Sequence, residues 1–208
     1  VHGRLIPLLG DVTAPGTQRR PGPSLRYLSS KLELPFLSDW IRQPGHFRPS
    51  TRMPQFFGLW DHLPGKGASD SAEKFEPLEV FAISYFLLQS SQSHAYLNPP
   101  TGVTEPADAG RGSVLFQERG CLACHSHQDF PGMEEYRDPQ QSVQGPDLSN
   151  LAGKFGSERN SNGPRWLYSW IKEPTRYHAR TVMPDLFLGP IEKKDAKGKV
   201  LEVTDPVA

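Results

Sequence analysis

The chain has 208 residues, and its 23 basic and 23 acidic side chains leave no formal net charge. This balance excludes a global electrostatic field that would steer the chain onto nucleic acid or an anionic membrane. The longest strongly apolar stretch, from Val80 to Leu88, is too short to span a bilayer, so we predict no transmembrane segment. The 19 glycines and 21 prolines predict short helices joined by long connections.

The N-terminal part of the chain carries a series of short motifs. Gly-Pro-Ser-Leu at 22–25 is followed by an aromatic and aliphatic segment at 36–41, then by Pro44 and by Met53. The segment from Phe75 to Gln89 is rich in apolar residues and predicts an amphipathic helix.

Residues 91–104 contain two adjacent prolines and a glycine, which predicts a semi-rigid linker between two domains. Four histidines stand apart from the motifs that carry chemistry. We expect them to be exposed, solvated loop residues rather than ligands: His46, His62, His94 and His127.

Ala107 to Arg119 predicts a helix, and Gly120 is a typical helix stop. The only two cysteines of the chain follow at once, in the order Cys121-Leu-Ala-Cys124-His125. Cys-x-x-Cys-His is the attachment signature of c-type haem, in which two thiols bond the porphyrin and the histidine reaches the iron. The motif therefore predicts one covalently bound haem.

Two other uses of such a motif fit less well. A thioredoxin-like thiol pair expects a strand and helix around it, which the flanking sequence does not offer. A structural zinc site needs four ligands, and His125 and His127 stand closer together than is usual for such a site. A disulfide between Cys121 and Cys124 would constrain almost no loop.

The sequence after the motif repeats the N-terminal order. Gly-Pro-Asp-Leu stands at 145–148, and Pro164 to Glu173 predicts a helix with an aromatic face, ended by Pro174. Met183 follows Pro174 by the nine residues that separate Met53 from Pro44. Agreement at so many fixed offsets indicates an internal duplication. We predict two domains, at 1–90 and 105–208.

The order of these motifs resembles the class I cytochrome c family, over 105–208 and in a weaker copy over 1–90. The resemblance implies an all-α fold of two small helical domains, with long Gly/Pro-rich loops around haem. It also implies that His125 and Met183 are the axial iron ligands, with His178 as the rival to Met183. By the same resemblance, the Pro146 carbonyl accepts a hydrogen bond from His125. The other residues expected to contact the haem are Leu148, Leu151, Trp166 and Trp170.

The first copy lacks the cysteines. His2 precedes Pro23 by the 21 residues that separate His125 from Pro146, so His2 and Met53 form a weaker second ligand pair. Either this copy has lost its haem and serves in packing or partner binding, or the chain is a piece of a longer protein and a second haem lies there. The stretch 204–208 looks like a helix start with no helix after it, which favours a piece.

With two axial ligands the iron has no open position, so the motifs favour electron transfer over catalysis. We expect a c-type cytochrome subunit or domain of a respiratory or dehydrogenase complex, an electron carrier rather than an enzyme. Its partners would be redox proteins or other subunits of a membrane-associated complex. The resemblance implies the periplasmic or extracytoplasmic face of an energy-transducing membrane. The alternatives are a dihaem peroxidase-like oxidoreductase and a haem-based sensor or structural module.

Overall fold

The computed structural model describes residues 22–103, 106–132, 145–155, 162–186 and 188–207. The described chain is mainly helical and contains one small sheet of two strands. The expected all-α class is therefore confirmed in its coarse form only. The finer expectation of two cytochrome c-like domains stays a prediction.

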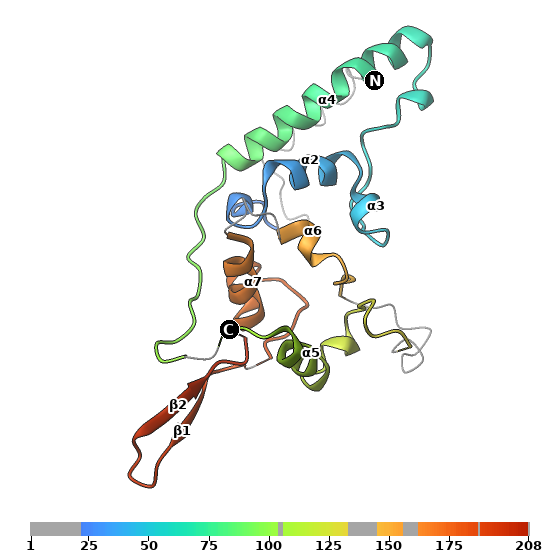
Figure 1. Ribbon diagram of the computed structural model, residues 1–208. Coiled ribbons are helices and arrows are strands. Elements are labelled where there is room, and N and C mark those ends of the chain that lie inside the picture. Colours follow the sequence, from blue (N-terminus) through green and yellow to red (C-terminus); the bar gives the residue numbers. More distant parts are fainter. Residues whose placement is uncertain (1–21, 104–105, 133–144, 156–161, 187, 208) are drawn as a thin grey trace.

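The first copy consists of short helices followed by one long helix (Figure 1). Its elements are η2 (Leu28–Ser30), α2 (Leu34–Arg42), α3 (Pro44–Phe47), η3 (Trp60–His62) and α4 (Lys66–Gln89). The helix predicted from residue 75 begins nine residues earlier, and Pro77 lies inside it.

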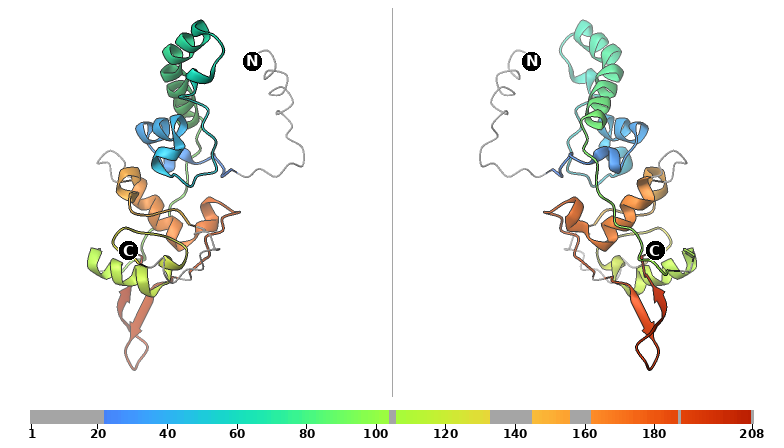
Figure 2. Two further views of the ribbon diagram at one scale, coloured as in Figure 1. Left: turned by 90° about the vertical axis from the view of Figure 1, so that its right-hand side faces the viewer. Right: turned by 90° about the vertical axis from the view of Figure 1, so that its left-hand side faces the viewer.

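The second copy begins with a helix and ends in a hairpin. Its elements are α5 (Ala109–Glu118), η4 (Cys121–Ala123), α6 (Leu151–Phe155), α7 (Asn162–Lys172), α8 (Pro174–Tyr177), β1 (Ile191–Lys194) and β2 (Val200–Thr204). The two side views place α4 at one end of the molecule and the hairpin at the other (Figure 2).

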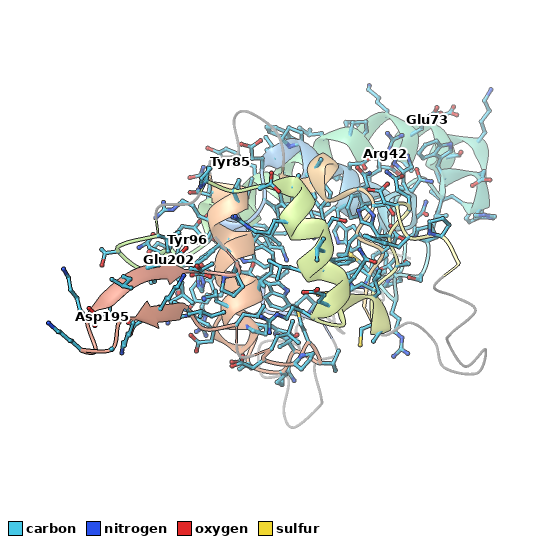
Figure 3. The ribbon with its side chains drawn as sticks, turned by 60° about the horizontal axis from the view of Figure 1, so that its bottom comes forward. Arg42, Glu73, Tyr85, Tyr96, Asp195 and Glu202 are labelled. Atoms are coloured by element: carbon cyan, nitrogen blue, oxygen red, sulfur yellow. The ribbon has the colours of Figure 1, made fainter. Side chains whose placement is uncertain are left out.

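The hairpin was not predicted. Strand β2 ends at Thr204, so the helix start expected at 204–208 falls directly after the hairpin and stays a prediction. Strand β1 pairs antiparallel with β2, with Ile191 opposite Thr204. Asp195 lies at the tip of the hairpin (Figure 3), where its carboxylate accepts hydrogen bonds from the amides of Lys197 and Lys199. Such side-chain bonds to the backbone stabilise tight turns.

The matched helix pairs of the two copies have the same local geometry. Helix α2 is followed by Gln43 (φ −145°, ψ 75°), and α7 is followed by Glu173 (φ −151°, ψ 78°). In each copy a fully buried proline, Pro44 or Pro174, then starts a four-residue helix. Pro174 therefore ends α7 as predicted, and it also begins the next helix, since proline suits the first helical turn.

One hydrophobic core joins the two copies. Leu37 and Ile41 of α2 lie in the same buried cluster as Phe155 of α6 and Trp166 of α7. Helix α4 contributes Val80 to this cluster. The shared core means that neither copy buries its apolar residues alone.

The segment predicted to be a linker lies against both copies (Figure 1). The amide of His94 donates to Ser30 Oγ at 3.0 Å, and the amide of Leu97 donates to Ser169 Oγ at 2.8 Å. The prediction that His94 is an exposed loop residue is wrong, because its side chain packs among three tyrosines and the residue is 9% exposed.

Helix α4 is apolar on more than one side. Val80 and Ser84 are buried on the side that faces α2, whereas Leu78, Phe81 and Phe86 are 49–66% exposed. The expected amphipathic helix therefore carries apolar side chains beyond its buried face. None of the described helices is long and apolar enough to cross a membrane.

Candidate haem site

The Cys-x-x-Cys-His motif forms one tight turn directly after α5. Gly120 has φ 75°, a left-handed conformation that glycine adopts without steric cost, and it ends the helix as predicted. The amides of Cys124 and His125 both donate to the Cys121 carbonyl, at 3.2 and 2.9 Å. A single turn of chain therefore carries both thiols and the imidazole.

The two thiols are not joined in a disulfide, and both residues are partly exposed. Burial raises the pKa of the Cys121 thiol above its ordinary value. Thiol–disulfide catalysts instead need a lowered thiol pKa, so the structure does not favour a thioredoxin-like pair. Among the described residues there is no group of three or more His, Cys, Asp or Glu side chains placed to bind a metal ion.

The ring of His125 is oriented by the segment 145–148. His125 Nδ1 lies 2.7 Å from the carbonyl oxygen of Pro146, which is the contact expected from the sequence. A carbonyl oxygen can only accept, so Nδ1 carries the proton and the lone pair stands on Nε2. This is the tautomer that a metal-binding histidine needs, with the second ring nitrogen held by a backbone carbonyl.

Gly145 is required by close packing against the motif. A Cβ at this position would overlap the His125 ring and would lie 2.8 Å from the Cys124 carbonyl oxygen. The Gly145 amide instead donates to that same oxygen at 2.9 Å. The glycine of the Gly-Pro pair thus lets the backbone approach the imidazole. The sequence alone did not indicate this role.

Further hydrogen bonds hold the segment 145–149 against the motif. The Leu148 amide donates to the Ser126 carbonyl at 3.0 Å, and Ser126 Oγ donates to Asp147 at 2.6 Å. Hydrogen bonds from Ser126 and Ser149 lower the pKa of the Asp147 carboxyl, so it is ionised at neutral pH. These bonds give His125 a fixed backbone environment.

Met183 lies in a turn that has a counterpart in the first copy. Its amide donates to Thr181 Oγ1 at 3.1 Å, as the amide of Met53 donates to Thr51 Oγ1 at 3.2 Å. Both methionines are half-buried, and His178 ends α8 at the position that matches Arg48. The axial-ligand role of Met183 stays a prediction.

The aromatic residues predicted to line the haem lie in the shared core. Trp166 is 4% exposed and stacks on Trp170 and Phe155, with ring centroids 5.3 Å apart in both pairs. Its Nε1 is buried and has no hydrogen-bond acceptor among the described residues. Leu151 begins α6 and packs against the same cluster, whereas Leu148 lies beside the motif.

Two lysines at matched positions of the repeat reach across between the copies. Lys31 Nζ of the first copy lies 3.8 Å from the ring centroid of Trp166 in the second. Lys154 Nζ of the second copy lies 5.5 Å from the ring centroid of Phe36, the residue that matches Trp166. The exchange is reciprocal, as in an interface with two-fold symmetry.

The sequence showed that Lys31 and Lys154 are matched, but it could not show that each faces the other copy. Burial lowers the pKa of Lys31 well below its ordinary value, and the charge of Lys154 adds to this effect. Burial and the charge of Arg48 lower the pKa of Lys154 to about 8. Burial at this interface therefore disfavours the charged form of both lysines.

The residues of the second copy fit a c-type haem. Two separate thiols, an imidazole with the correct tautomer and a backbone that approaches the ring closely are all in place. Of the second predicted ligand pair, Met53 lies in the turn that matches the Met183 turn, and His2 lies outside the described residues.

Comparison of the chain with protein-family models, curated proteins and solved structures gives no match.

Proposed function

We propose that the chain is an electron carrier with a c-type haem bonded to Cys121 and Cys124 and with His125 and Met183 as axial ligands. The observation that carries this proposal is the Cys-x-x-Cys-His turn, together with the contact of His125 Nδ1 to the Pro146 carbonyl. A bound haem would supply the Fe(III)/Fe(II) couple.

The protein groups have separate tasks in this proposal. Cys121 and Cys124 attach the cofactor, and the Pro146 carbonyl holds the His125 ring so that Nε2 faces the ligand position. Met183 supplies a thioether, which favours the reduced state relative to a second imidazole. If His125 and Met183 both held the iron, no coordination position would remain for a substrate, so this ligand set would favour electron transfer over peroxide or gas chemistry.

The partners that we propose are redox proteins or other subunits of a membrane-associated respiratory or dehydrogenase complex. The proposed location is the periplasmic or extracytoplasmic face of an energy-transducing membrane, where attachment of c-type haem takes place. The zero formal net charge predicts that reduction of the protein by its partner depends only weakly on salt concentration.

A second haem in the first copy is a further candidate, and one observation favours it. The turn of Met53 has the same amide-to-threonine hydrogen bond as the turn of Met183. Residues 1–90 contain no cysteine, and Val1 stands where the second cysteine of the motif would be.

The test is to produce the chain in a bacterial periplasm together with the haem-attachment machinery. We expect an intact mass higher by one haem, and a pyridine haemochrome spectrum of a porphyrin with two thioether bonds. The oxidised protein should show the weak absorption band at the red end that reports methionine ligation. Met183→Ala should remove this band, whereas Met53→Ala should leave it. A colourless protein with two free thiols would overturn the proposal.

A further inference from the structure

A buried ion pair lies between α7 and the end of the hairpin. Lys172 Nζ is 3.1 Å from Asp205 Oδ1 and also donates to the carbonyl oxygen of Leu188. The hydroxyl of Tyr168, one turn earlier on α7, donates to Asp205 Oδ2 at 2.7 Å. The Val207 amide donates to Asp205 Oδ1 at 2.9 Å, so three groups donate to one carboxylate.

This pair is shielded from solvent and is well satisfied. The side chain of Asp205 is 0% exposed and that of Lys172 is 14% exposed. Burial alone would raise the pKa of Asp205, but the hydrogen bonds from Tyr168, Val207 and Lys172 hold it below its ordinary value. An ionised carboxylate with all these donors is a rigid anchor, because removing it would leave Lys172 charged and buried.

The anchor holds the segment that carries Met183. Leu188 follows Met183 by five residues and is 8% exposed. The near end of this segment is held by the bond from the Met183 amide to Thr181, and the far end by the bond from Lys172 to the Leu188 carbonyl. Since Lys172 is the last residue of α7, the pair fixes the methionine segment relative to that helix.

The first copy ties down its own methionine segment at the matched place. Gly58 matches Leu188, and its amide donates to Glu76 Oε2 at 2.6 Å. Arg42, which matches Lys172, lies with Nε 3.8 Å from Glu76 Oε1. In the first copy the carboxylate of Glu76 therefore lies between the methionine segment and the last residue of α2. In the second copy the last residue of α7, Lys172, bonds the segment directly, and the carboxylate of Asp205 pairs with Lys172. A buried carboxylate thus stands at the matched place in both copies, although the two carboxylates come from unrelated elements.

We propose that Asp205 is a positioning residue for Met183: through Lys172 and the Leu188 carbonyl it keeps the thioether in its ligand position. This inference rests on the proposed function, since it names what sets the distal ligand of that site. Asp205 itself contacts neither the ligand nor the cofactor in this proposal.

The experiment compares the haem-loaded wild type with Asp205→Asn, Tyr168→Phe and the double variant Lys172→Met/Asp205→Leu. The double variant removes both charges together, so it leaves no unpaired buried charge and is expected to fold. Glu76→Gln is the matched control, because it breaks the corresponding contact in the first copy. The measurements are the red absorption band of the oxidised form against pH, the reduction potential, and the free energy of unfolding.

We expect Asp205→Asn and the double variant to lose at least half of the band at pH 7 and to have lower reduction potentials. Tyr168→Phe removes one of the three donors to Asp205 and should therefore lose less of the band than Asp205→Asn does. Glu76→Gln should lower the unfolding free energy and leave the band and the potential unchanged. A wild type with haem but no band would overturn the Met183 assignment and this inference together. A wild-type band that persists in the Asp205 variants would overturn this inference alone.

Discussion

The two copies of the repeat share their turns but differ in the element that completes them. Both have a helix, a buried proline, a four-residue helix and a methionine turn with the same backbone bonds. The first copy is then closed by the long helix α4, whereas the second is closed by the hairpin β1–β2. Local turns thus recur in both copies, and the closing element does not.

The buried carboxylate shows how different elements can do the same task. Glu76 of α4 accepts from the backbone amide of Gly58, whose φ of 72° presents the amide inward. In the second copy the backbone offers the Leu188 carbonyl instead, so a cation, Lys172, binds it and Asp205 binds the cation. Because a carboxylate accepts and an ammonium donates, each arrangement satisfies the buried groups by a different route.

The largest difference between the copies should be haem attachment. Replacing Cys121 and Cys124 with alanine removes every cysteine, so the intact mass should fall to that of the polypeptide alone. His125→Ala should remove the proximal ligand and greatly lower haem content, whereas His127→Ala, two residues away, should keep it. Covalent haem in the variant without cysteines would contradict attachment through Cys121 and Cys124.

Replacing the glycine of the Gly-Pro pair with alanine should destabilise the protein in the second copy (Gly145→Ala) but not in the first (Gly22→Ala). The new Cβ would overlap the His125 ring and press on the Cys124 carbonyl, and we expect a loss of about 2 kcal/mol of unfolding free energy. Gly22→Ala is the matched control, since a Cβ there meets nothing within 4 Å and should change stability by less than about 0.5 kcal/mol. Urea denaturation of both variants measures the difference, and equal losses would contradict the packing argument.

Lys154→Met tests the reciprocal interface through its pH dependence. The pKa of Lys154 is about 8 in the folded chain against an ordinary 10.5, so the unfolded chain binds more protons between these pH values. The unfolding free energy of the wild type should therefore rise with pH across this window, by about 2 kcal/mol.

In Lys154→Met this rise should shrink, because the titrating group is gone. Lys31→Met should act in the same direction, since burial lowers the pKa of Lys31 as well. Lys197→Met, in the exposed hairpin turn, is the control and should keep the wild-type slope. Unfolding curves at several pH values measure how the unfolding free energy changes with pH. If this dependence were unchanged in both Lys154→Met and Lys31→Met, the two lysines would not titrate in this pH range.

The smallest effect should come from the two buried prolines, and it should be equal in the two copies. Pro44→Ala and Pro174→Ala each remove a fully buried ring that starts a helix, with an expected loss of about 1 kcal/mol. Pro35→Ala, exposed at the start of α2, should cost less. Thermal unfolding measures the loss of unfolding free energy in each of the three variants. Clearly unequal losses for Pro44→Ala and Pro174→Ala would show that the two prolines are packed differently.

The sequence by itself determined the local features of the site. The contact of the Pro146 carbonyl to His125, 21 residues away in the sequence, was expected from the family resemblance of the motifs. Gly120 predicted the end of α5, and Pro174 predicted the end of α7. These two ends depend on the allowed backbone angles of a few adjacent residues. A motif of this kind can be read wherever it stands in the chain.

Only the tertiary structure decided which surfaces meet. It buried His94 between the copies, placed Lys31 over a ring of the other copy, and joined Asp205 to Lys172 across 33 residues of sequence. It also formed a hairpin over 191–204, which the sequence did not predict. Burial and long-range pairing depend on the packing of distant segments, and that packing energy outweighs the weak local preferences from which the sequence was read.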